Sequence, residues 1–460
     1  MGSLAKLFSP TDMTVGSPAK RIIEFAVPML IGNIAQQLYS TVDSIVVGKY
    51  VGDNALASVG SATPILNLLL VLFIGISTGA GIMVSQYFGA KDRKQLSHTV
   101  GCTITLTLIS SIIIMVVGPL VSRPMLEFLD TPDSIIDWCT SYLNISLIGI
   151  AGLAYYNILS GVLRGVGDSL SALLYLLVAT VLNIALDIYF VANLNMGVAG
   201  VALATAIAQG VSASLCLLKL IRMKDIFDLN FSCLKLVKKH AMAVIRLGIP
   251  SGMTQAIFSL AMIVVQALTN SFGEMFIAAN VIIMRVDGFA MMPNFSFGNA
   301  MTTYTGQNVG AGKNERVDQG AKAGTLVAVA TSATITLLIL VFGKYLMGVF
   351  TETTELVDLS MRMMRILALG YIAMAVTQSL SGVMRGAGDT MTPMWISLIT
   401  TVAVRIPVAY GIAWLTKSAE YPNGRSECVF LSLLTSWVLG ALITFIIYKR
   451  GNWKKKTILE

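Results

Sequence analysis

Residues 160–168 read SGVLRGVGD, and residues 381–389 read SGVMRGAGD, so one nine-residue stretch occurs twice, 221 positions apart. Seven of its nine positions are identical. At the same offset, QYFGA at residues 86–90 matches QNVGA at residues 307–311. Two matches in one register indicate an internal duplication, which organises the whole chain.

The composition places the duplicated chain in a membrane. Of its 460 residues, 55% are hydrophobic and 12% are charged, and the mean hydropathy is +0.77. Soluble domains are about a quarter charged, and repeated apolar runs of ~20 residues suit helices that cross a bilayer. A β-barrel would show short alternating segments instead. The sequence therefore predicts an all-α membrane protein.

The apolar runs predict twelve transmembrane helices, arranged as two six-helix repeats. We expect an N-terminal lobe over residues 1–221, a cytoplasmic linker over 222–242 and a C-terminal lobe over 243–460. The expected helices lie at residues 21–46, 54–82, 95–119, 134–159, 169–191, 197–220, 243–270, 276–304, 318–342, 354–381, 390–414 and 428–449. An even number of helices per half makes the repeat parallel, and such folds bind substrates near the membrane midplane.

Basic residues fix the expected orientation. Lys and Arg gather at residues 91–94, 222–239, 313–322 and 449–456, whereas the loops on the other side are mixed or acidic. The positive-inside rule then places both termini on the cytoplasmic side of the membrane, which we expect to be the plasma membrane. The net charge of +8 is interpreted in the same way, as loops facing anionic lipid rather than a surface for nucleic acid.

Two polar residues interrupt the apolar stretch LLVATVLNIALDIYF, residues 176–190. Asn183 and Asp187 lie four positions apart, which places both side chains on one face of a helix. A carboxylate at membrane depth costs at least ~2.5–3.5 kcal/mol, so it normally faces protein or water and marks a pathway. The alternative is a carboxylate whose hydrogen bonds to neighbouring helices are only structural.

The two halves differ at these polar positions. Asn183 corresponds to Val404 and Asp187 to Val408 at the offset of 221, and Asp43 corresponds to Val265 at 222. A duplication kept only for packing predicts matched polar positions, which are not seen. We infer one cation-coupling site in the N-terminal half. A buried carboxylate can hold a proton near neutral pH, and carboxylate and amide oxygens can also ligate Na⁺, so both ions remain candidates.

Pro28 lies in the same apolar run as Asp43, and it repeats as Pro250 at an offset of 222. A proline within a helix removes a hydrogen bond and permits a kink. We predict that Pro28 is a conformational hinge, with a static kink as the alternative.

The second half carries its own charges. Arg285 and Asp287 are two positions apart, so they do not face each other, and Arg405 lies in the eleventh expected helix. These residues are candidates for a substrate cavity or for a buried ion pair within the lobe. Met291, one of 24 methionines, is a candidate for the cavity because flexible, polarizable side chains suit varied ligands.

The duplicated SGVxRGxGD motif, the QxxGA motif after the second and eighth helices, and Pro28 with Asp43 resemble the multidrug and toxic compound extrusion (MATE) family. The resemblance covers nearly the whole chain. It implies a V-shaped pair of lobes and an antiporter that exports amphipathic, often cationic drugs against Na⁺ or H⁺. In one branch of this family a cation site lies in the first lobe, and its ligands correspond to Asp43, Asn183, Asp187, Thr205 and Tyr142 here. Na⁺ would then be held by the first four of these residues.

The chain differs from another branch of the family, which has acidic residues in its seventh and tenth helices. Here the corresponding segments read GMTQAIFSLAM at residues 252–262 and YIAMAVTQSL at residues 371–380, without an acid. Coupling through the second lobe is therefore not expected.

These observations predict a monomeric, cation-coupled exporter that needs no cofactor other than its coupling ion. Its expected partners are drug-like small molecules and the lipid bilayer, with no nucleic acid. A flippase for a lipid-linked saccharide is the alternative, because buried arginines can hold phosphate. An enzyme is not expected, since the sequence has no HExxH motif and its one GxSxG match, GISTG at residues 75–79, has no base partner placed in the membrane. Its five cysteines and two histidines show no metal-site spacing.

Overall fold

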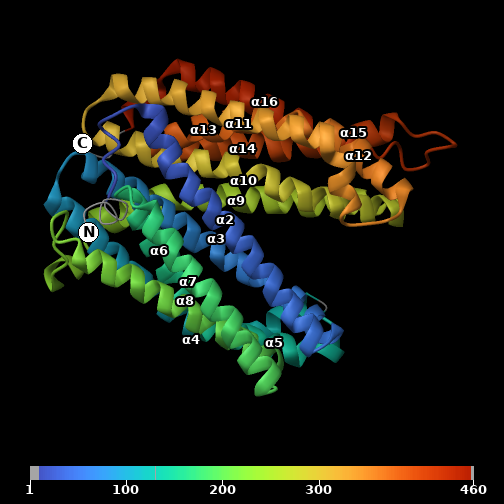
Figure 1. Cartoon of the computed structure of the whole chain (residues 1–460), viewed down its shortest axis with the longest axis horizontal. Coiled ribbons are helices and arrows are strands. Elements are labelled where there is room, and N and C mark those ends of the chain that lie inside the picture. The colour runs from blue at the N-terminus through green and yellow to red at the C-terminus, as the bar shows by residue number, and fades with distance from the viewer. Residues whose placement is uncertain (1–9, 130, 457–460) are drawn as a thin grey trace. The chain divides into compact units, whose positions relative to one another are not determined.

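The computed structural model describes residues 10–129 and 131–456, apart from the side chains of residues 44, 53 and 56. Residues 1–9 and 457–460 of the expected lobes lie outside that description. The first half contains α2 (Pro18–Tyr50), α3 (Asp53–Gly89), α4 (Arg93–Phe128), α5 (Asp133–Ile148), α6 (Ile150–Gly165), α7 (Ser169–Asp187), the π-helix η1 (Ile188–Asn193) and α8 (Gly197–Arg222). Figure 1 shows this order along the chain.

The second half repeats this order. A short 3₁₀ turn, η2 (Phe231–Leu234), precedes α9 (Lys238–Asn270), α10 (Glu274–Gly310), α11 (Asn314–Gly348), α12 (Thr354–Ala368), α13 (Gly370–Gly386), α14 (Met391–Leu398), the π-helix η3 (Ile399–Val404), α15 (Arg405–Leu415), α16 (Cys428–Arg450) and η4 (Asn452–Lys455). The pairs α3 with α10 and α5 with α12 begin 221 residues apart, as the motifs do.

The predicted all-helical membrane fold is confirmed. Among the described residues, nine helices are long and apolar enough to cross a membrane, and counting two bent pairs raises the number to eleven. Those pairs are α5 with α6, bent by 49°, and α12 with α13, bent by 41°, and each pair covers one expected helix. The one expected helix outside this count is the first, which corresponds to α2 and whose polar residues include Asp43. Twelve spans in two repeats are consistent with this structure.

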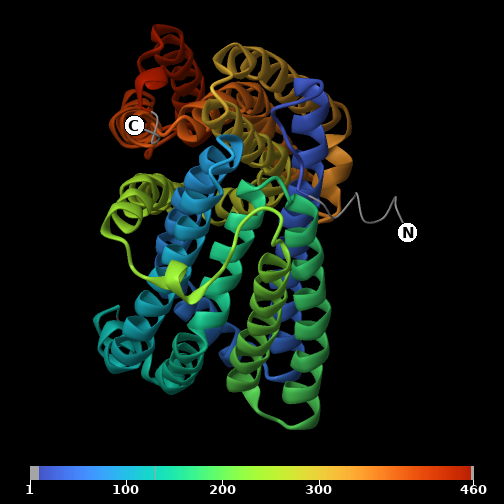
Figure 2. The ribbon, with the colours of Figure 1, turned by 90° about the vertical axis from the view of Figure 1, so that its left-hand side faces the viewer.

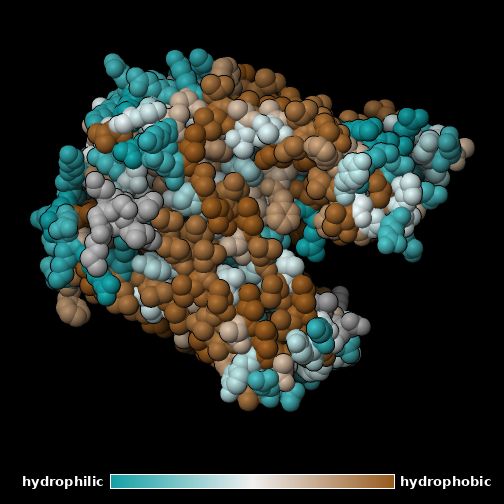
Figure 3. Space-filling view, viewed as in Figure 1, coloured by the Kyte–Doolittle hydropathy of each residue, from teal (hydrophilic) through white to brown (hydrophobic). Residues whose placement is uncertain are grey.

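The chain forms two compact units. Unit 1 comprises Met1–Asp12 and Val27–Gly252, and unit 2 comprises Met13–Ala26 and Met253–Glu460. In unit 1, α7 and α8 lie side by side, as Figures 1 and 2 show. Apolar side chains cover the visible helices along their middle lengths, and polar ones gather at the helix ends (Figure 3). The lobe boundaries inferred from the repeat stay a prediction, because these units are defined by packing alone.

The SGVxRGxGD motif has a structural role in each unit. Its last residue starts the next helix: the Asp168 carboxylate accepts a hydrogen bond of 2.9 Å from the Ser171 amide, and Asp389 accepts one of 3.1 Å from Thr392. Such capping satisfies amides that have no partner within the helix. The preceding glycine has φ +90° at Gly167, a conformation that side chains disfavour. The motif therefore ends one helix and begins the next.

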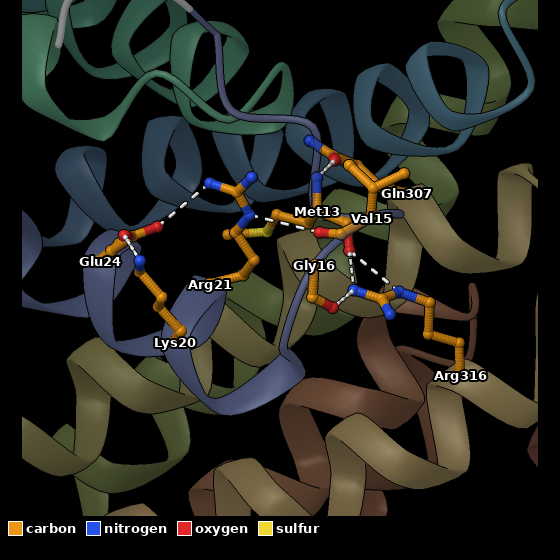
Figure 4. A network of polar contacts seen from close by, with 8 residues as sticks. All are labelled: Met13, Val15, Gly16, Lys20, Arg21, Glu24, Gln307 and Arg316. Carbon is orange, nitrogen blue, oxygen red and sulfur yellow. Dashed lines mark hydrogen bonds and ion pairs between the residues drawn. The ribbon is translucent and has the colours of Figure 1, made fainter.

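The segment before α2 is held by unit 2 (Figure 4). Met13 is fully buried, and its amide donates a hydrogen bond of 2.8 Å to Gln307 Oε1, in the second QxxGA motif. Arg316 Nη2 donates to the carbonyl oxygens of Met13, at 3.2 Å, and Gly16, at 2.6 Å. Arg21 forms an ion pair of 3.2 Å with Glu24 on α2.

Candidate functional site

Three helices of unit 1 bring polar side chains together. α2 supplies Tyr39 and Asp43, α7 supplies Asn183 and Asp187, and α8 supplies Thr205. On α2 and on α7 the two residues are four positions apart, so each helix presents its pair on one face. These faces point into the protein, because Tyr39, Asn183 and Asp187 are buried whereas apolar residues elsewhere on the same helices, such as Leu38 and Val181, are exposed. The structure thus brings together Asp43, Asn183, Asp187 and Thr205, which lie far apart in the sequence.

The Asn183 amide is at the centre of this cluster. One end of the amide lies 2.8 Å from Asp43 Oδ1 and 3.1 Å from Asp187 Oδ2. The other end lies 3.3 Å from the Tyr39 hydroxyl and 3.3 Å from the Thr205 hydroxyl. Ionised carboxylates only accept hydrogen bonds, so the amide nitrogen faces the two acids and the oxygen faces the hydroxyl groups. The two hydroxyls also contact each other, at 3.2 Å.

The centre of the cluster is buried, and one of its oxygen atoms has no described hydrogen-bond partner. Asn183 and Asp187 are fully buried, and Asp187 Oδ1 has no hydrogen-bond partner among the described residues. A buried oxygen without a partner costs about 1–3 kcal/mol, so such an atom favours a proton or cation. Directly after Asp187 the chain changes to the π-helix η1. Single π-turns within helices are frequent at functional sites.

Tyr142 lies at the edge of the cluster. Its ring packs against two apolar clusters of unit 1, and its hydroxyl lies within electrostatic reach of Asp43 and Asp187. The fifth residue named by the resemblance is therefore near the two acids, with no direct hydrogen bond to them described. Tyr39, by contrast, was missed by the sequence reasoning. Its signal is its position four residues before Asp43, which places it on the same helix face.

The available ligands are all oxygen and amide groups. Hard cations such as Na⁺ take oxygen ligands, whereas transition metals prefer nitrogen and sulfur. No group of three or more His, Cys, Asp or Glu side chains able to hold a metal occurs in the part of the chain that the structure describes. His98 and His240 do come together, with ring centroids 6.3 Å apart, but without a third such ligand. The cluster suits a proton or an alkali cation.

The other candidate residues lie elsewhere. Pro28 is inside α2, next to Val27, the residue at which the chain passes from unit 2 to unit 1. In unit 2, Arg285 is exposed, and Met291 is buried in an apolar cluster, 3.8 Å from the Asn294 amide nitrogen. Asp287 and Arg405 are close enough to interact electrostatically, yet they form no ion pair within 4.0 Å in the described structure. Whether these residues line a cavity stays a prediction.

A duplicated helical bundle with a cluster of two neighbouring acids inside its first half is typical of a membrane transporter, because binding and moving a charge needs no covalent chemistry. The MatE family model matches the chain twice, at residues 28–189 and 250–411. The two matches repeat the internal offset and cover more than half of the chain. The protein belongs to the MATE family and is a transporter, not an enzyme.

Relatives and solved structures agree with this assignment. The chain is 28% identical over 445 residues to the "Probable multidrug resistance protein YpnP" of Bacillus subtilis (strain 168), covering 96% of this chain and 97% of the relative. It is 24% identical to the "Probable multidrug resistance protein NorM" of Thermotoga maritima, covering 99% and 97%. A solved "outward-facing conformation of a multidrug resistance MATE family transporter" matches its fold with a TM-score of 0.89, 22% identity and coverage of 97% and 99%.

Proposed function

We propose that the protein is an antiporter of the plasma membrane that exports amphipathic, often cationic compounds by alternating access. Inward movement of Na⁺ or H⁺ drives the export. The protein works as a monomer with both termini in the cytoplasm. The observation that carries this proposal is the buried cluster of Asp43, Asn183 and Asp187 in unit 1, whose counterparts in the repeat are valines.

In this proposal the cluster holds the coupling cation. Asp43 and Asp187 supply the negative charge, and Asp187 Oδ1 has the free capacity to accept a proton or to ligate Na⁺. Thr205 and Tyr142 complete the site with hydroxyl groups, as the family resemblance implies. Burial keeps water from competing for the ion, which strengthens each electrostatic contact.

Na⁺ binding requires a specific change at Asn183. Its nitrogen faces the two acids, but a cation between them would be ligated by the amide oxygen. The amide must therefore turn over when Na⁺ enters. Tyr39 and Thr205, on its other side, carry hydroxyls that both donate and accept, so they satisfy either orientation. A proton placed on Asp187 would not need this rotation, which gives the two ions different structural consequences.

Pro28 provides the proposed link from the ion to the transport cycle. It precedes Asp43 by fifteen residues on the same helix, and proline removes the hydrogen bond that would resist bending there. A change of charge at Asp43 would then alter the preferred shape of α2. The alternative of a static kink predicts the same helix in the loaded and unloaded states.

The test is dye export from cells that express the transporter. Asp43→Asn and Asp187→Asn should each abolish export of a fluorescent cation while the protein is still made and folded. Val408→Asn, which places an amide at the repeat equivalent of Asp187, serves as the matched control and should leave export intact. Normal export and drug resistance in both acid variants would overturn the proposal.

A further inference from the structure

The linker between α8 and α9, drawn in yellow-green in Figure 2, carries exposed apolar and basic side chains. Phe231, the first residue of η2, is 92% exposed, and Leu236 is 49% exposed. Three exposed lysines accompany them, at the end of the linker and in the first turn of α9: Lys235, Lys238 and Lys239. Residues 222–239 contain five basic and two acidic residues, so this stretch is positively charged. An apolar and cationic surface is typical of segments that lie on a membrane.

Hydrogen bonds fix the linker along α4, within unit 1. The Asp228 amide donates a hydrogen bond of 2.9 Å to the Ser97 hydroxyl, near the start of α4. Eight residues further along the helix, the Thr105 hydroxyl donates one of 2.5 Å to the Leu234 carbonyl oxygen, at the end of η2. Eight helical residues rise by about 12 Å, so the linker follows α4 over roughly that distance. Its exposed side chains are therefore held at a defined height on the helix.

The linker covers a face of α4 that is exposed further along the helix. Gly101 lies against the linker, where a Cβ atom would overlap the Cys233 carbonyl oxygen. Leu108 and Ile112 follow Gly101 and Thr105 by seven residues each, so they continue the same stripe. Both are about half exposed, and Leu108 is the first exposed large apolar residue along the described length of α4. Because α4 is long and apolar enough to span a membrane, this stripe faces lipid, and the linker lies on the lipid-facing side of the helix.

The length of α4 indicates how deep the linker reaches. From Leu108 to the helix end at Phe128 the chain rises about 30 Å, the thickness of the hydrocarbon core. Thr105 lies about 5 Å before this segment, at the depth of the lipid headgroups. Ser97 lies about 16 Å before it and is beyond the headgroups, which extend roughly 5–8 Å from the core. The η2 turn, bound at Thr105, is therefore level with the headgroup layer, whereas the start of the linker is in water.

We propose that the linker is a membrane-interface anchor that binds anionic lipid. Phe231 and Leu236 insert where the headgroups meet the acyl chains, and the three lysines bind the phosphate groups of anionic lipids in the adjacent leaflet. Each lysine near an anionic membrane surface favours this contact by about fivefold. A soluble protein partner fits this surface less well, because the surface lies on the lipid-facing side of α4 and at headgroup depth. The inference depends neither on the coupling ion nor on the exported compound.

The first test measures the depth of Phe231. The five natural cysteines are buried, so Phe231→Cys in the full chain can be labelled selectively with a fluorescent maleimide. The labelled protein is placed in vesicles of phosphatidylcholine and phosphatidylglycerol. A lipid with a quencher near the top of its acyl chain should reduce the emission at least about twofold, and aqueous iodide should have little effect. Asp225→Cys is the matched control: it is exposed on the same linker, next to Lys224, whose carbonyl oxygen accepts a hydrogen bond from Arg93 at the start of α4, and its label should respond to iodide only.

The second test measures the preference for anionic lipid. At equal amounts, a quencher lipid with a phosphatidylglycerol headgroup should quench the label at position 231 at least about threefold more than one with a phosphatidylcholine headgroup. Replacing Lys235, Lys238 and Lys239 together by glutamine should make the two lipids equal, and replacing them by arginine should keep the preference, because arginine retains the charge. A label at position 231 that responds to iodide as the one at position 225 does would show a surface free for a soluble partner. That result, or equal quenching by both headgroups with the lysines present, would overturn the proposal.

Discussion

Replacing Asp187 by asparagine should remove cation binding without removing the fold. The change keeps the size and shape of a side chain that is fully buried and lies 3.1 Å from the Asn183 amide. It deletes one of the two negative charges that would hold the ion. A hydrogen bond or contact to a charged group contributes about 1.5–3 kcal/mol, so the cation should bind roughly 10- to 150-fold more weakly.

The assay is thermal unfolding of the purified protein while one cation is increased and the other is held constant. A ligand that binds only the folded state stabilises it by about 2.7 kcal/mol at 100 times its Kd. For a variant with a ~100-fold weaker Kd, the same concentration adds only about 0.4 kcal/mol. The melting temperature of Asp187→Asn should therefore respond little to the cation that stabilises the parent.

The difference in stability between Asp187→Asn and the parent at low cation concentration provides a second check. Without a bound ion the parent buries two acids close together, so the neutral asparagine should make the folded state equally stable or more stable. Val408→Asn, at the equivalent position of unit 2, should keep the full cation response. An Asp187→Asn variant with an unchanged response to both Na⁺ and pH would refute the assignment of this cluster as the ion site.

Three other changes test separate parts of the structure. Tyr39→Phe removes one hydroxyl beside Asn183 and should raise the cation concentration for half-maximal transport about 2- to 10-fold, as for one neutral hydrogen bond. Gly79→Ala should destabilise the protein by about 1–3 kcal/mol in thermal unfolding, because its Cβ would press on α9, whereas Gly60→Ala, with open space around it, should be neutral or slightly stabilising. Arg316→Ala removes hydrogen bonds to the segment before α2 and should increase maleimide labelling of a cysteine placed at Met13, which is unreactive while buried.

Much of the fold follows from the sequence because the duplication and the apolar runs are strong signals. A motif with seven of nine identical residues fixes the register of the halves. In the structure, Asp168 and Asp389 each lie at the start of a helix and accept a hydrogen bond from one of its first amides. The helix ends were less predictable. α3 continues to Gly89, beyond the apolar run that ends near residue 82, and Ser85 and Gln86 in this extension are fully buried in protein.

The residues of the site likewise include some that the sequence reveals and some that it does not. Asp43, Asn183 and Asp187 stand out because a charge or amide in an apolar helix is costly. Tyr39 does not stand out, since a tyrosine is tolerated in many environments, and only the helical spacing relates it to Asp43.

The central claim is that the unit 1 cluster couples an inward cation to outward transport. The most direct measurement is transport of a fluorescent cation in proteoliposomes, with a Na⁺ gradient and a pH gradient imposed separately, for the parent and for Asp43→Asn combined with Asp187→Asn. We predict that the parent transports the dye only when a Na⁺ gradient or a pH gradient is imposed. The double variant should transport no dye in response to either gradient. Equal gradient-driven transport by both proteins would contradict the account.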